Sequence, residues 1–259
     1  MAHLIAIRRL PRRYVFVLIL CAGIIALIPF ASIALNADSP VDTAKGFLLK
    51  TEEAVFITSP LELRLIHQGF VDVQALDPSI MVDLKYAGMD NFMEVNVYGD
   101  LTRAYLRPEA AIKLVRASEI LQKRYPGLRL LVVDALRPRS VQHKMWNIVS
   151  NTPMQPYVAN PHSGSMHNYG AAVDVTLYDT EKGESLDMGT PVDYFGPLAQ
   201  PALESEFLRQ GKLSETQVKN RLVLRTIMLE AGWHMINIEW WHFDAFPLNY
   251  IRQNFTIVE

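Results

Sequence analysis

The stretch Ser165-Met166-His167-Asn168-Tyr169-Gly170-Ala171-Ala172-Val173-Asp174 has the pattern S-x-H-x-x-G-x-A-x-D, and the rest of the chain is interpreted from it. A second stretch, Glu239-Trp240-Trp241-His242, lies downstream. Together they supply two imidazoles and a carboxylate that can hold a metal, and a further glutamate that can activate water. A catalytic zinc site needs three protein ligands and one open position. A zinc-bound water also needs a base, since its pKa is lowered only to about 7. The two stretches therefore predict the zinc centre of a peptidase.

The spacing within each stretch limits where the side chains can lie. His167 and Asp174 can turn toward one point if the first is in a loop and the second on the next strand, and Gly170 frees the backbone between them. Glu239 and His242 are three apart in a β-prone run, where a flat strand would place them on opposite faces. That pair therefore requires a bulge or a strand end. Each pair alone is more often a capped loop or part of the core. The two pairs taken together favour a metal site, because each pair lies beside a predicted strand end.

Regular elements are expected on both sides of these stretches. Strands are expected at 71–73, 80–84, 128–133, 171–177 and 233–243. Helices are expected at 108–125, 140–148 and 218–229, the last preceded by a capping box at 214–217. Residues 178–213 are expected to be a loop-rich insertion. Because strands and helices mix without regular βαβ spacing, the sequence predicts an α+β domain with a mainly antiparallel sheet flanked by helices.

Composition restricts the partners and the kind of metal site. Half of the 259 residues are hydrophobic, so the chain can bury a sizeable core. Four arginines and no acid lie in residues 1–37, and removing them changes the formal net charge from −2 to −6. A mildly acidic body argues against a nucleic-acid partner. The only cysteine, Cys21, lies in the N-terminal apolar run, so a metal in the body must use His, Asp and Glu.

The N-terminus has the features of a targeting segment. Four arginines precede an uncharged run from Tyr14 to Ala37, in the order typical of a secretory signal. The run also approaches the roughly 20 residues that can span a bilayer. We expect residues 1–37 to be a signal peptide or a membrane anchor that engages the membrane or the export machinery. We further expect 38–60 to be a linker, 61–259 to be the catalytic domain, and the body to be exported to the periplasm.

These motifs resemble the D-alanyl-D-alanine dipeptidases of the vancomycin-resistance type, within the zinc D,D-peptidase and hedgehog-like superfamily. Besides the two stretches above, three further segments carry the resemblance, over about residues 70–250. They are Asp83-Leu84-Lys85-Tyr86-Ala87 with Asp90-Asn91-Phe92, then Asp134-Ala135-Leu136-Arg137-Pro138, and Met188-Gly189-Thr190-Pro191-Val192-Asp193. Val192 stands where the family usually has Phe. The resemblance implies a zinc peptidase fold of this superfamily.

The resemblance also implies a role for each residue of the site. It implies that His167, Asp174 and His242 are the ligands of one zinc ion per chain. It implies that Glu239 is the general base and that Arg137 stabilises the tetrahedral oxyanion. Tyr86, Ser165 and Asp193 are then the groups that receive the free amino end of a small dipeptide. The alternative for three of these residues is a purely structural role: an ion pair with Asp134 for Arg137, core packing for Tyr86 and a capped turn for Asp193.

Three functions are weighed on this basis. The first is zinc-dependent hydrolysis of the D-Ala-D-Ala dipeptide, taken from cell-wall turnover. The second is a D,D- or L,D-carboxypeptidase that trims peptidoglycan stem peptides, which the export signal favours. The third is a zinc-binding domain without catalysis, against which the intact Glu239 and Arg137 argue. Trp240 and Trp241 are expected to wall the site. The histidines expected to lie outside it are His67, His143, His162 and His234.

Overall fold

The computed structural model describes residues 48–51 and 54–259. The predicted signal or anchor, 1–37, lies outside the described residues. Within the described part of the chain, no helix is both long and apolar enough to cross a bilayer.

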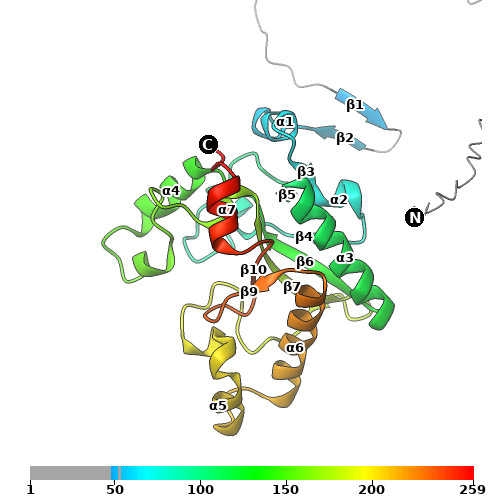
Figure 1. Cartoon of the computed structure of the whole chain (residues 1–259), viewed down its shortest axis with the longest axis vertical. Helices are drawn as coiled ribbons and strands as arrows, with labels where there is room; N and C mark the ends of the chain where they lie inside the picture. The colour runs from blue at the N-terminus through cyan, green and yellow to red at the C-terminus, as the bar shows by residue number, and fades with distance from the viewer. Residues whose placement is uncertain (1–47, 52–53) are drawn as a thin grey trace, which may run out of the picture. The chain divides into compact units, whose positions relative to one another are not determined.

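The described elements follow one another along the chain, and Figure 1 shows their arrangement. The strands are β1 (Leu48–Thr51), β2 (Ala54–Ile57), β3 (Val71–Asp72), β4 (Met81–Val82), β5 (Tyr105–Leu106), β6 (Leu128–Asp134), β7 (Ala172–Asp179), β8 (Glu184–Ser185), β9 (His234–Met235) and β10 (His242–Asp244). The α-helices are α1 (Pro60–His67), α2 (Val73–Leu76), α3 (Pro108–Arg124), α4 (Arg139–Val149), α5 (Glu204–Arg209), α6 (Glu215–Glu230) and α7 (Leu248–Asn254). The short 3-10 helices are η1 (Lys85–Ala87), η2 (Gln155–Tyr157), η3 (Met166–Tyr169), η4 (Pro197–Ala199) and η5 (Pro201–Leu203).

The central sheet has the order β4-β6-β7-β10-β9, with β8 paired to β7. β4 runs parallel to β6, and the other pairs of this sheet are antiparallel. The prediction of an α+β domain with a mainly antiparallel sheet is therefore confirmed. A register shift between Val132 and Asp134 places Asp134 opposite Asp174 on β7. Bulges of this kind re-aim side chains at the end of a ladder.

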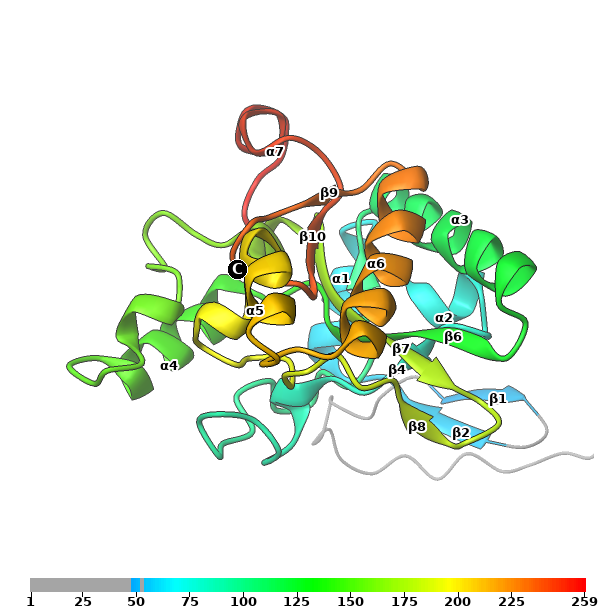
Figure 2. The ribbon, with the colours of Figure 1, turned by 90° about the horizontal axis from the view of Figure 1, so that it is seen from below.

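One face of the sheet is covered by helices. α3 contacts β6 and α6, and the two helices lie side by side in Figure 2. Alternate residues of the strands, such as Leu130 and Val132 on β6 and Val173 and Val175 on β7, are fully buried in this core. Because successive strand residues point to opposite faces, Asp174 and Thr176 on β7 point to the other face. That face carries the cavities described below.

Three sequence predictions need correction. The run 233–243 is not one strand but β9 and β10, joined by a loop that contains Glu239. The expected strand 71–73 has only two strand residues, since Asp72 caps α2 by accepting a hydrogen bond from the Gln74 N–H (3.0 Å). The insertion 178–213 contains β8, α5 and two 3-10 helices. β1 and β2 lie within 38–60, and the linker expected over this range stays a prediction.

Candidate metal centre and its cavity

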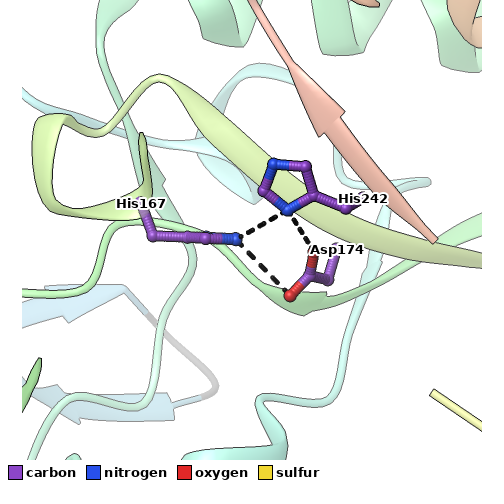
Figure 3. Close-up of side chains that lie close together, drawn as sticks. All are labelled: His167, Asp174 and His242. Carbon is purple, nitrogen blue, oxygen red and sulfur yellow. Dashed lines mark hydrogen bonds and ion pairs between the residues drawn. The ribbon is translucent and has the colours of Figure 1, made fainter. Parts of the chain in front are cut away.

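Three ligand atoms converge at the end of the central sheet (Figure 3). Asp174 on β7 and His242, the first residue of β10, are directly opposite each other in the antiparallel ladder. His167 lies in η3, the single turn that leads into β7. Gly170 ends that turn with a φ of +64°, a conformation that glycine adopts without strain. A strand pair and the turn before it thus bring together residues that are distant in sequence.

The separations of the ligand atoms fit a tetrahedral metal ion. His167 Nε2 lies 3.4 Å from Asp174 Oδ2 and 3.2 Å from His242 Nδ1, and His242 Nδ1 lies 3.0 Å from Asp174 Oδ1. An ion with bonds of about 2.0–2.1 Å holds tetrahedral ligands roughly 3.3 Å apart. All three side chains are buried, with exposed fractions of 2%, 4% and 8% for His167, Asp174 and His242. The cluster therefore offers one ligand atom from each side chain at separations suited to a single metal ion.

Hydrogen bonds fix which ring nitrogen of each histidine faces the cluster. His167 Nδ1 lies 2.7 Å from the carbonyl oxygen of Ala135, so it must donate there and leave Nε2 as the ligand. His242 Nε2 lies 3.1 Å from Asp244 Oδ1 and leaves Nδ1 as the ligand. Metal-binding histidines usually donate their other nitrogen to a carbonyl or carboxylate in this way.

The carboxylate and the imidazoles of the cluster shift one another's pKa values. Burial acts to raise the pKa of Asp174, but the adjacent His167 and His242 outweigh it and keep that pKa well below its ordinary value. Burial acts to lower the pKa of His242, but Asp174 and Asp244 on its two sides raise it well above its ordinary value. A metal must displace the proton from His242, so its binding releases protons.

All eight residues singled out from the sequence line one cavity of about 410 Å³, which we call the site cavity. They are Tyr86, Arg137, Ser165, His167, Asp174, Asp193, Glu239 and His242. Glu239 is half-buried, and burial raises its pKa although the nearby His242 acts to lower it. A raised pKa makes a carboxylate a better proton acceptor near neutral pH.

Arg137 is held at the cavity wall by structural contacts. It forms a buried ion pair with Asp134, and its Nη1 donates to Gln142 Oε1 at 3.1 Å. The structural alternative considered for Arg137, an ion pair with Asp134, is therefore real. Among the described residues, its buried Nε has no hydrogen-bond partner. One fixed donor is thus left over on a cation that lines the cavity.

Tyr86 and Asp193 meet at the cavity from segments that are 107 residues apart in sequence. The Tyr86 hydroxyl donates to the carboxylate of Asp193, at 3.1 Å from each oxygen. Burial, together with the charge of Asp174, raises the pKa of Asp193 to about 7. Burial and the charge of Asp193 raise the pKa of Tyr86 well above its ordinary value, so the phenol stays a donor. Asp193 has a φ of +62°, which is uncommon outside glycine and is enriched at functional sites.

Ser165 has a local duty besides lining the cavity. Its Oγ accepts the His167 N–H at 3.3 Å, while Asn168 Oδ1 accepts the Ser165 N–H at 2.6 Å. This capping box fixes η3. Since Oγ acts there as an acceptor, its hydroxyl proton can still be donated into the cavity.

Sequence reasoning missed Asp244 and gave Asp134 only a structural role. Asp244 follows His242 by two residues in β10, so both side chains point to one face, and this H-x-D spacing was the available signal. Asp134 accepts hydrogen bonds from the Tyr98 hydroxyl and the Ala135 N–H as well as pairing with Arg137. Nothing in the local sequence connects Tyr98 with Asp134.

The structure also shows where the other tryptophans and histidines considered in the sequence lie. Trp241 lines the site cavity, whereas Trp240 lines a neighbouring one and donates its Nε1–H to Thr190 Oγ1 at 2.8 Å. None of the other histidines in the described ranges lines the site cavity. Those residues are His67, His143, His162 and His234.

Comparison with known proteins agrees with this geometry. Residues 66–258 match a family model described as D-ala-D-ala dipeptidase. The D-alanyl-D-alanine dipeptidase of Escherichia coli K12 is 33% identical over 174 residues, covering 67% of this chain and 83% of that protein. The protein of the same name from Enterococcus faecium is 28% identical, covering 70% of this chain and 96% of that protein. Another, from Enterococcus faecalis V583, is 26% identical, covering 74% of this chain and all of that protein. This chain is therefore a member of the D-Ala-D-Ala dipeptidase family.

Proposed function

We propose that the protein is a zinc-dependent peptidase that hydrolyses the free D-Ala-D-Ala dipeptide. The observation that carries the proposal is the meeting of a His-Asp-His cluster, a half-buried glutamate, an arginine and an Asp–Tyr pair in one cavity. Each of these groups has a task in hydrolysis of a peptide with a free amino end. A zinc-binding domain without catalysis would need only the cluster.

The residues divide the work as follows. His167, Asp174 and His242 would hold zinc, which when bound acidifies a water and polarises the scissile carbonyl. Glu239 takes the proton of the attacking water and passes it to the leaving amine. Arg137 stabilises the charge that develops on the carbonyl oxygen, since it is a buried cation held in place by Asp134 and Gln142. Asp193, oriented by the Tyr86 hydroxyl, binds the substrate ammonium.

Substitutions separate metal binding from proton transfer. His167→Ala, Asp174→Ala and His242→Ala should each lose zinc and activity, because two ligands and a water bind zinc poorly. Glu239→Gln should retain zinc and lose about 10²–10⁴-fold in kcat, because it removes only the base. Elemental analysis and steady-state kinetics on the same preparations measure both effects. A full equivalent of zinc in all three ligand variants would contradict the metal assignment, and wild-type turnover in Glu239→Gln would contradict the mechanism.

The substrate's amino end gives the sharpest test of specificity. If Asp193 binds an ammonium, an N-acetyl group leaves that buried carboxylate without its charged partner. Loss of a hydrogen bond to a charged group costs about 1.5–3 kcal/mol, which is roughly a tenfold to hundredfold loss in kcat/KM. We expect free D-Ala-D-Ala to be preferred over its N-acetyl form by that factor. Asp193→Ala should reduce this preference, because it should lower kcat/KM for the free dipeptide only. Equal hydrolysis by the wild type, with trimming of stem pentapeptides, would favour a carboxypeptidase instead.

The N-terminal 37 residues support an additional proposal about location. Their arginine cluster and apolar run would export the catalytic domain, as a periplasmic protein or one anchored to the inner membrane. The dipeptide would then come from cell-wall turnover. Fractionation of cells that express the full chain and a chain lacking residues 1–37 tests this, with the truncated chain expected to remain in the cytoplasm.

A further inference from the structure

A second cavity, of about 420 Å³, adjoins the site cavity. Its lining includes Leu131, Val133 and Thr176, which point to the face of the sheet opposite the α3–α6 side. Thr176 follows Asp174 by two residues on β7, so both side chains point to the same face of the sheet. Asp174 lines the site cavity and Thr176 lines the second cavity, so the two cavities lie next to each other on that face. Among the described residues, only Phe92 and Asp193 line both cavities.

The ring of Phe92 is held in place by other aromatic side chains of the site cavity. It meets Tyr86 edge-on, with ring centroids 6.3 Å apart, and Phe195 edge-on at 4.8 Å. Phe195 in turn stacks on Tyr157 at 4.5 Å. The four rings come from three separate segments of the chain, and all of them line the site cavity. The position of Phe92 is therefore fixed by contacts made across the cavity.

The loop that carries Phe92 is also fixed from within. The side-chain amide of Asn91 lies within hydrogen-bond distance of the carbonyl oxygens of Lys85 (3.1 Å), Gly88 (2.9 Å) and Val95 (3.0 Å). Its Oδ1 accepts the Met93 N–H at 3.0 Å. One side chain thus closes the loop around the residue next to Phe92.

We propose that Phe92 is a specificity-determining residue whose ring separates the substrate cavity from a space large enough for an N-terminal extension. The inference rests on the proposed dipeptidase function, because it assigns the substrate ammonium to Asp193, the other residue shared by the two cavities. Atoms added to that nitrogen would lie beside Phe92 and the second cavity, because Asp193 and Phe92 line both cavities. A small residue at position 92 joins the cavities and admits N-acyl dipeptides or tripeptides with a short apolar acyl end, which matches the apolar lining of Leu131, Val133 and Leu186.

The test compares Phe92→Ala with the wild type on D-Ala-D-Ala and on N-acetyl-D-Ala-D-Ala. We expect the ratio of kcat/KM for the acetylated over the free form to rise at least tenfold. Phe92→Leu should shift the ratio less and in the same direction, and it keeps an apolar side chain if the alanine variant folds poorly. The matched control is Phe207→Ala, since Phe207 is also half-buried but lines neither cavity; it should leave the ratio unchanged.

A double variant tests whether the added acyl group enters the second cavity, by filling that cavity with a large side chain. Ser185 is exposed on β8 and lines only the second cavity. Phe92→Ala/Ser185→Trp should lose the gain on the acetylated form and keep the dipeptide hydrolysis of Phe92→Ala. Binding of N-acetyl-D-Ala-D-Ala, measured by calorimetry in a Glu239→Gln background with and without Phe92→Ala, should follow the same order without any turnover.

The outcomes distinguish this inference from the proposed function. A wild type that does not hydrolyse D-Ala-D-Ala overturns the proposed function, and the calorimetric comparison then still decides whether Phe92 is a partition. An unchanged ratio in folded Phe92→Ala and Phe92→Leu overturns the partition and leaves the dipeptidase proposal standing. A gain that persists in the Ser185→Trp double variant also overturns it, because the added group then does not enter the second cavity.

Discussion

At the scale of single residues, the site depends on how each charged group is supported by a neighbour. His242 lies between Asp174 and Asp244, and His167 donates to the backbone at Ala135. Such partners orient metal ligands and strengthen them as donors, and losing one typically costs 10–100-fold in metal affinity. The supporting residue Asp244 therefore belongs to the functional site although it is not a ligand.

Asp193 makes stability depend on pH. Its pKa is raised by burial from 3.8 to about 7, so between these values the folded chain holds a proton that the unfolded chain has lost. The associated stability is fully present below pH 3.8 and is lost as pH rises to 7. Asp193→Asn should not lose stability in this way, because its side chain does not ionise in this pH range. We expect the free energy of unfolding of Asp193→Asn, measured by urea denaturation of the metal-free proteins, to rise relative to that of the wild type between pH 4 and pH 8. The same difference at both pH values would show that Asp193 ionises normally.

At the scale of elements, the turn between η3 and β7 sets the distance between two ligands. Gly170 adopts a φ of +64°, and a Cβ there would lie 2.6 Å from Phe70 Cε1. A substitution therefore meets backbone strain of about 1–2 kcal/mol and a steric conflict with the ring. The turn must either open, which moves His167 away from Asp174, or displace Phe70 from the core.

Gly170→Ala should lower the free energy of unfolding by roughly 2–5 kcal/mol, combining that strain with the 1–3 kcal/mol typical of overpacking. Gly211→Ala is the control, because Gly211 also has a positive φ of +67° but nothing lies within 4 Å of its added Cβ. It should lose only the strain contribution. Urea denaturation of both variants measures the difference, and zinc content shows whether His167 has moved. Equal losses in the two variants would mean that Phe70 accommodates the methyl group.

At the scale of the whole molecule, one metal ion would join the turn at η3, strand β7 and strand β10. A ligand that binds only the folded chain stabilises it by about 2.7 kcal/mol at a free concentration of 100 times Kd. For a domain of this size that is roughly 5–10 °C in Tm. We expect chelation to lower the Tm by this amount and re-addition of zinc to restore it. His242→Ala should show no change on chelation. Equal Tm values for the wild type with and without chelator would argue that no ion bridges these elements.

The sequence by itself was sufficient to predict the fold class and the eight residues of the candidate site. For His167, Asp174, Glu239 and His242 the reason is local, because histidines and carboxylates at these spacings beside strand ends favour a metal site. Tyr86, Arg137, Ser165 and Asp193 were expected at the site only because their segments resemble the motifs of the family. The same local patterns located α3, α4, α6, β6 and β7 to within a few residues. The run 233–243 was mispredicted as one strand because β-propensity favours its apolar residues, whereas pairing with β7 begins only at His242.

Only the tertiary structure decided which distant groups meet. The cross-strand register places His242 opposite Asp174, and loop packing places Tyr86 against Asp193 and puts Phe92 on the lining of both cavities. The support of His242 by Asp244, and the burial that raises the pKa of Asp193, also follow from packing. Local periodicity records which face a side chain is on, but not which other element covers that face. Contacts between segments about 100 residues apart are set by the packing of the whole domain, so they could be identified only in the folded chain.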